Sequence, residues 1–88
     1  MYTLKIKRKA LRAASRLPEG AKRQVEETLK VLQTKPIPAR TYDIKKMRGV
    51  EDTYRIRIGS TRIVYTIKRG QRTIIIHYIG SREKAYKS

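Results

Sequence analysis

The stretch Arg48-Gly49-Val50-Glu51-Asp52-Thr53-Tyr54-Arg55-Ile56-Arg57-Ile58-Gly59-Ser60-Thr61-Arg62-Ile63-Val64-Tyr65 decides the fold. Apolar and basic residues alternate strictly over 54–58, as they do in a strand that buries one face. Gly59-Ser60 then suits a two-residue hairpin loop, because glycine accepts the positive φ that a type II′ turn needs at its first position. Closing the hairpin at this turn pairs Ile58 with Thr61, Arg57 with Arg62, Ile56 with Ile63 and Tyr54 with Tyr65.

The predicted hairpin has one apolar face and one basic face. The apolar face carries Tyr54, Ile56, Ile58, Ile63 and Tyr65, and the basic face carries Arg55, Arg57 and Arg62. Like charges directly opposite each other on paired strands cost up to roughly 1 kcal/mol, so this cluster favours a bound anion. Basic side chains that simply lie over a solvated sheet would also explain the pattern. Because the rest of the chain is strongly basic as well, we favour a polyanion site.

The chain is small and very basic. Its 88 residues include 23 Lys and Arg against 7 Asp and Glu, which gives a net charge of +16. This length suits one domain with one modest core. So much charge disfavours the compact state of a small domain by self-repulsion. A nucleic-acid ligand and an acidic protein partner would both account for it.

Several classes of site lack their sequence patterns. Cysteine is absent, which excludes disulfides and thiolate–metal sites, and one histidine among scattered acids gives no metal-ligand spacing. No apolar run approaches the roughly 20 residues of a membrane span, and the start of the chain lacks a signal-peptide core. We therefore expect a cytoplasmic protein without metal, cofactor or small-molecule ligand. The absence of asparagine and cysteine beside dense Lys, Arg and Ile leans toward a thermophile.

Two helices are expected before the hairpin. Residues 2–7 alternate and predict a first strand. From about Lys9 the apolar residues fall at helical spacing, and a second helix is expected from Glu19 until Pro36-Ile37-Pro38 stops it. The apolar stripes of the two helices are Ala10, Leu11, Ala14 and Leu17, then Ala21, Val25, Leu29 and Leu32. A strand followed by a helical hairpin is the expected opening of a two-layer α/β domain.

Two further strands flank the hairpin in sequence. Residues 43–47 suit a short edge strand. Residues 73–79 carry apolar side chains at both parities, which predicts a central strand covered on both faces. His77 lies in this isoleucine-rich run, and we interpret it as structural, because a catalytic histidine needs a positioned partner and nothing local supplies one. Catalysis would then rest on arginines and tyrosines, which stabilise charge well but transfer protons poorly.

The order and spacing of several segments resemble the RelE/ParE superfamily of toxin–antitoxin toxins, and the archaeal RelE branch most of all. The segments are Lys46 to Gly49, Tyr54 to Gly59, Arg62 to Tyr65, and Ile79-Gly80-Ser81-Arg82-Glu83-Lys84-Ala85-Tyr86. The resemblance implies a single RelE-like toxin domain over residues 1–88. Its α+β, two-layer fold is a mainly antiparallel sheet of four or five strands, the first beside the last, with a helical hairpin packed on one face.

The resemblance also implies an activity. RelE toxins are mRNA interferases, endoribonucleases that cut messenger RNA in the ribosomal decoding site and arrest growth. Without metal, the ribose 2′-oxygen attacks the adjacent phosphate and leaves a 2′,3′-cyclic phosphate and a free 5′-hydroxyl. The resemblance places Arg62 and Arg82 on the phosphate, and assigns base stacking or proton transfer to Tyr86. RNA-backbone binding falls to Lys46, Arg48, Arg55 and Arg57.

One departure from the family leaves the general base open. Arg55 and Arg57 match positions that are lysines in the well-known bacterial members. A lysine can lose its proton when its pKa is depressed, whereas an arginine effectively cannot.

Two alternatives remain beside the nuclease. ParE-type members share the fold but poison DNA gyrase, and a plain basic RNA-binding protein would need no activity. The set Arg62, Arg82 and Tyr86 favours the nuclease, because a gyrase inhibitor has no chemical need for it. The expected partners are the ribosome, messenger RNA and an acidic, partly disordered antitoxin of the RelB type that wraps the basic domain.

Overall fold

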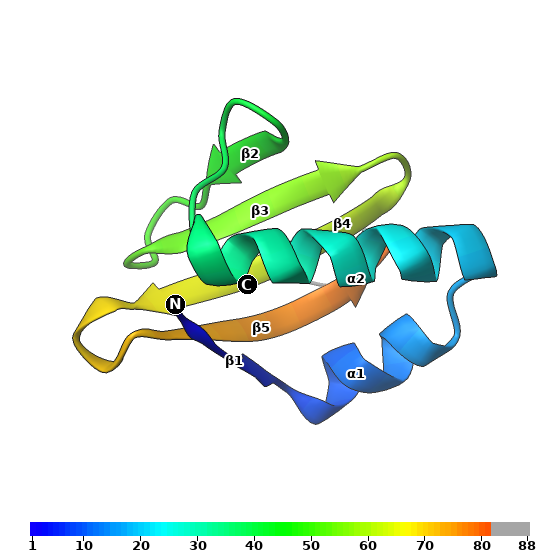
Figure 1. Ribbon diagram of the computed structural model, residues 1–88, viewed down its shortest axis with the longest axis horizontal. Helices are drawn as coiled ribbons and strands as arrows, with labels where there is room; N and C mark the ends of the chain where they lie inside the picture. The colour runs from blue at the N-terminus through cyan, green and yellow to red at the C-terminus, as the bar shows by residue number, and fades with distance from the viewer. Residues whose placement is uncertain (82–88) are drawn as a thin grey trace.

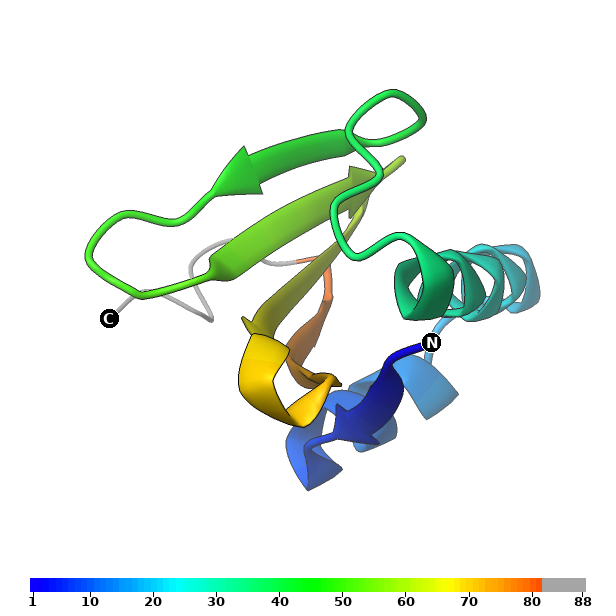
Figure 2. The ribbon, with the colours of Figure 1, turned by 60° about the vertical axis from the view of Figure 1, so that its left-hand side comes forward.

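The computed structural model describes residues 1–81, in which two helices pack on one face of a five-stranded sheet (Figures 1 and 2). The elements are β1 (Thr3–Ile6), α1 (Arg8–Ser15), α2 (Glu19–Thr34), β2 (Asp43–Lys46), β3 (Thr53–Ile58), β4 (Thr61–Lys68), the 3-10 turn η1 (Arg69–Gln71) and β5 (Thr73–Gly80). The predicted two-layer α+β fold is confirmed, and the segment at 43–46 supplies the fifth strand. Neither helix in residues 1–81 is long and apolar enough to cross a membrane.

The strand order is β1-β5-β4-β3-β2, so the first strand lies beside the last, as expected. β1 pairs with β5 in parallel, and the other neighbouring strands pair in antiparallel fashion. The parallel pair is possible because the helices and three strands lie between its members in the chain, which is ample length for a crossover. β2 and β1 form the two edges of the sheet.

The β3–β4 hairpin has the predicted register: Arg57 lies opposite Arg62, Ile56 opposite Ile63, and Tyr54 opposite Tyr65. A type II′ turn requires a positive φ at its first central residue and not at its second. Gly59 has a φ of 59°, and Ser60 is not among the residues with a positive φ. Directly opposed residues project from the same face of a sheet, so the arginines lie on one face of the hairpin and the isoleucines on the other.

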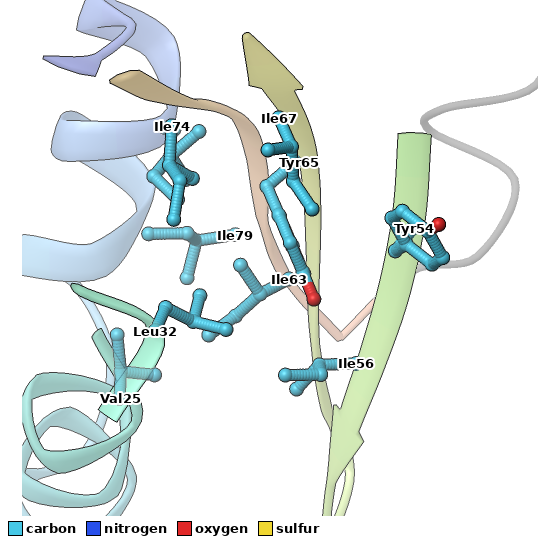
Figure 3. Packing of buried hydrophobic residues seen from close by; sticks show 11 residues of the cluster. Val25, Leu32, Tyr54, Ile56, Ile63, Tyr65, Ile67, Ile74 and Ile79 are labelled. Atoms are coloured by element: carbon cyan, nitrogen blue, oxygen red, sulfur yellow. The ribbon is translucent and has the colours of Figure 1, made fainter. Parts of the chain in front are cut away.

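The core fills the space between the helices and this isoleucine face (Figure 3). Its fully buried members from the sheet are Ile56, Ile63, Tyr65, Ile67, Ile74, Ile76 and Ile79. They meet Val25 and Leu32 of α2 and Ala10 of α1. The Tyr65 hydroxyl donates to the Pro36 carbonyl oxygen at 2.7 Å, which ties the segment after α2 to the sheet. Burial raises the pKa of Tyr65, and neighbouring Tyr54 raises it further.

The apolar stripe of α1 is narrower than its sequence predicts. Ala10 is buried, but Leu11 is 56% exposed. Successive residues of a helix are about 100° apart around its axis, so a two-turn helix that turns Ala10 toward the sheet turns Leu11 aside. In α2 the stripe contains Thr28 as well as Val25 and Leu32, because the Thr28 hydroxyl donates to the Gln24 carbonyl oxygen at 2.8 Å.

A bulge explains why Ile79 has the opposite parity to the other core isoleucines of β5, Ile74 and Ile76. Val64 pairs with Tyr78 but Tyr65 pairs with Ile76, so His77 is an extra residue on β5. The extra residue shifts the alternation by one, and Ile74, Ile76 and Ile79 therefore all reach the core. β5 lies inside the sheet, between β1 and β4, as expected. The expectation that both of its faces are covered is corrected, because Ile75 and Tyr78 on the face away from the helices are only partly buried.

Candidate nucleic-acid interface

The sheet face away from the helices carries two rows of paired residues that run from β2 to β5. One row contains Asp43, Arg57, Arg62 and Gly80. The next row contains Lys45, Arg55, Val64 and Tyr78. We call the surface of these two rows the arginine face. The predicted cluster Arg55, Arg57 and Arg62 is thus brought together on one surface.

Asp43 provides an internal counter-charge for the opposed arginines. Its Oδ2 lies 3.1 Å from Arg57 Nε and 3.0 Å from Arg57 Nη2. The two side chains are 45% (Arg57) and 56% (Asp43) exposed, so the pair contributes at most about 1 kcal/mol. Sequence reasoning missed Asp43. The available signal was the alternation of Asp43, Ile44 and Lys45, which places both charged residues on the face opposite Ile44.

Arg62 is less exposed than Arg57. Its side chain is partly buried, and its Nη1 donates to the Ser81 carbonyl oxygen at 3.0 Å. Arg55, in the neighbouring row, is also partly buried, and Val64 between Arg55 and Tyr78 is almost completely covered. Guanidinium groups that are oriented before a ligand arrives bind an anion with less loss of side-chain freedom.

The other predicted backbone-binding residues lie elsewhere. Lys46 pairs with Tyr54 and so belongs to the opposite face, whereas Lys45, which is not among the predicted binding residues, pairs with Arg55. Arg48 lies in the loop 47–52, where it lines a hollow with Lys46 and Asp52. The roles of Lys46 and Arg48 stay predictions. Arg82 and Tyr86 lie outside the described residues, and their roles also stay predictions.

One of the two acidic residues of that loop, Asp52, is engaged within the protein. Asp52 has a φ of 49°, and its carboxylate accepts from Arg69 Nε at 3.0 Å and from Arg69 Nη2 at 3.2 Å. This hydrogen-bonded pair lowers the pKa of Asp52 and raises that of Arg69. The contact fixes the loop against η1. Within residues 1–81, His, Asp and Glu side chains nowhere gather in threes that could hold a metal ion.

His77 has a positioned partner after all, from the neighbouring strand β4. Its Nε2 lies 2.7 Å from Thr66 Oγ1, which lies 2.7 Å from Thr53 Oγ1, and Thr53 donates to the Glu51 carbonyl oxygen at 3.0 Å. Since each hydroxyl has one proton, Thr66 donates to Thr53, and the Nε2–H of His77 donates to Thr66. Burial lowers the pKa of His77, and Lys7 and Lys68 lower it further. At neutral pH the imidazole is therefore uncharged.

A mixed five-stranded sheet with the first strand beside the last, helices on one face and arginines on the other defines a RelE-like toxin fold. Residues 2–86 match the family described as "ParE toxin of type II toxin-antitoxin system, parDE". The chain belongs to this family, within the RelE/ParE superfamily of toxins.

Individual relatives agree with this assignment. The chain is 36% identical over 87 residues to "Putative toxin RelE1" of Methanocaldococcus jannaschii. The matched residues cover 99% of this chain and 97% of the relative. It is similar to a chain in the crystal structure of the archaeal RelE-RelB complex from Pyrococcus horikoshii, with a TM-score of 0.84, 28% identity and coverage of 94% of this chain and 97% of that chain. The isolated E. coli RelE toxin has the same fold, with a TM-score of 0.79, 24% identity and coverage of 98% and 92%. The predicted fold and superfamily are confirmed.

Proposed function

We propose that this protein is the toxin of a RelBE-type module and an endoribonuclease that cleaves messenger RNA on the ribosome. The observation that carries the proposal is the directly opposed pair Arg57 and Arg62, with Arg55 in the next row. These cations lie on the sheet face that the helices leave uncovered and suit a phosphodiester backbone. The relatives named RelE support the same activity.

The proposed reaction needs no metal ion. The ribose 2′-oxygen attacks the adjacent phosphorus, and the bond from phosphorus to the 5′-oxygen of the next nucleotide breaks. The 2′-hydroxyl loses one proton and the leaving 5′-oxygen gains one, so the products are a 2′,3′-cyclic phosphate and a 5′-hydroxyl. Arg62 and Arg82 would stabilise the charge that develops on the phosphate, and Tyr86 would stack on a base or assist proton transfer.

Arg62 and Arg57 are suited to different tasks. The guanidinium of Arg62 is oriented by the Ser81 carbonyl oxygen and is partly buried, so it suits charge stabilisation in the transition state, where a preorganised donor needs little rearrangement. Arg57 is more exposed and is paired with Asp43, so it suits an exchangeable contact with a flanking phosphate. We assign backbone binding to Arg55 and Arg57 on the arginine face. Lys46 and Arg48, which line the hollow of the loop 47–52, would bind the backbone of a more distant part of the RNA.

We further propose that an acidic, RelB-like antitoxin neutralises the toxin. Besides the net charge of +16, the chain offers an apolar hollow formed by α1, α2, β1 and β5. It is lined by residues that include Ile6, Leu11, Ala14, Val25, Leu29 and Ile79. An amphipathic helix could place its apolar anchors there, while opposite charges speed association. Co-expression with the neighbouring open reading frame should yield a small acidic protein that co-purifies at moderate salt, and purification of this chain alone would contradict the proposal.

Inhibition of DNA gyrase is the second candidate, because the matching family bears the ParE name. Primer extension after brief expression should reveal new 5′ ends within coding sequences, whereas purified protein should leave gyrase supercoiling unchanged. Inhibited supercoiling without new 5′ ends would replace the nuclease by a gyrase inhibitor. Neither effect, with RNA binding retained, would leave a non-catalytic RNA-binding protein.

A further inference from the structure

We propose that Tyr78 is a nucleobase-stacking residue of the arginine face, where it receives one base of a single-stranded RNA whose phosphates contact the arginines. The inference rests on the proposed function and specifies how the RNA is held. It assigns to β5 the contact with a nucleobase, whereas the arginines contact only phosphates.

The bulge in β5 brings Tyr78 to this face. Tyr78 has the same parity as Ile74 and Ile76, which are buried in the core, and a regular strand would turn its side chain there too. Because His77 is an extra residue, Tyr78 instead pairs with Val64, in the row of Arg55. Bulges commonly redirect a side chain beside a functional site.

Gly80 provides the space for the ring. A Cβ atom at Gly80 would lie 2.6 Å from Tyr78 Oη and 2.9 Å from Tyr78 Cζ, so the phenol end of the ring lies across the backbone of this glycine. Gly80 pairs directly with Arg62, and the Arg62 side chain donates to the adjacent Ser81 carbonyl oxygen. The Tyr78 ring therefore extends from the row of Arg55 to the row of Arg62.

An aromatic ring among arginines is the usual combination for single-stranded RNA, because bases stack on the ring while the cations contact the phosphates. Tyr78 is partly buried and so retains exposed surface. The other tyrosines in residues 1–81 belong to the core or pack against it: Tyr2, Tyr42, Tyr54 and Tyr65. Within the part of the chain that the structure describes, Tyr78 is thus the tyrosine that projects from the arginine face.

Binding of an uncleavable RNA tests the proposal. The probe is a short 2′-O-methyl oligoribonucleotide, compared by fluorescence anisotropy with a series in which one abasic position is moved along it. Tyr78→Ala should weaken binding of the intact probe roughly 5- to 150-fold, as expected for loss of one stacked base, and leave binding of one abasic probe unchanged. Tyr78→Phe should behave as wild type, because the ring and not the hydroxyl makes the contact.

Gly80→Ala tests the position of the ring without removing it. The added methyl group must displace the phenol, so Gly80→Ala should also weaken binding of the intact probe. In the double variant with Tyr78→Ala it should cause no further loss of affinity, because the two changes remove the same interaction. Thermal melting of each variant verifies its fold. Arg62→Ala should weaken all probes, abasic or intact, because it removes a phosphate contact.

Two results would overturn the stacking role. If Tyr78→Ala weakens the intact probe and every abasic probe equally, the ring only supports the face by packing beside Val64. If Tyr78→Ala has no effect, the bases lie elsewhere. If the wild-type protein cleaves messenger RNA, either of these results for Tyr78→Ala removes the stacking inference alone. If the wild-type protein neither binds the probes nor cleaves messenger RNA, the proposed function fails together with the stacking inference.

Discussion

Replacing Asp43 by asparagine tests whether the arginine face is built for a polyanion. The Asp43 carboxylate lies 3.0 Å from Arg57 Nη2, where it neutralises a cation that an RNA phosphate would otherwise contact. Both side chains are about half exposed, so loss of the ion pair should lower the free energy of unfolding by about 1 kcal/mol or less. RNA binding should tighten, because the phosphate no longer competes with an internal carboxylate.

The phosphate contact that Arg57 gains in Asp43→Asn can be measured from the salt dependence of RNA binding. Each additional phosphate contact with single-stranded RNA steepens the plot of log Kobs against log salt concentration by about 0.7. Glu27→Gln is the matched control, because Glu27 is exposed on α2 and its replacement changes the net charge equally. Anisotropy titrations over a range of KCl concentrations should show the steeper slope in Asp43→Asn only. Equal slopes in the two variants would refute a specific role for Arg57 in phosphate binding.

Two further predictions concern the side chains of Tyr65 and His77. Tyr65→Phe removes the donor to the Pro36 carbonyl oxygen and should lower the free energy of unfolding by about 1–3 kcal/mol; an unchanged urea midpoint would contradict this. Because the folded protein lowers the pKa of His77, the unfolded chain binds the proton more readily, so stability should fall as the pH drops from about 6.5 through the folded-state pKa and level off above that range. Thermal melts over this pH range should show the fall in stability for the wild type but not for His77→Gln. If both proteins show the same fall, groups other than His77 cause it.

The hairpin and its register could be predicted because two independent local signals agree. The alternation over 54–58 fixes which residues share a face, and the glycine at position 59 fixes where the strands reverse. Shifting the register by one residue would bury the arginines and expose the isoleucines. The cluster of Arg55, Arg57 and Arg62 was therefore predictable from the sequence alone.

The remainder of the site depends on pairings between distant segments. Asp43 meets Arg57 only through the pairing of β2 with β3, and the Thr53–Thr66–His77 chain crosses three strands. The bulge at His77 leaves no local signal, since Ile74, Ile75 and Ile76 already break the alternation before the extra residue. The position of Tyr78 follows from that bulge and so could not be predicted either.

Cleavage of messenger RNA on ribosomes by the purified protein tests the central claim most directly. Arg62→Ala should lower the single-turnover rate by roughly 10²- to 10³-fold, as expected for loss of one preorganised charge-stabilising donor. Arg23→Ala, which removes an exposed arginine from α2, should cleave as wild type does. The downstream product should carry a 5′-hydroxyl that polynucleotide kinase can label directly. Wild-type cleavage by a folded Arg62→Ala variant would contradict the proposal that the arginine face is the catalytic surface.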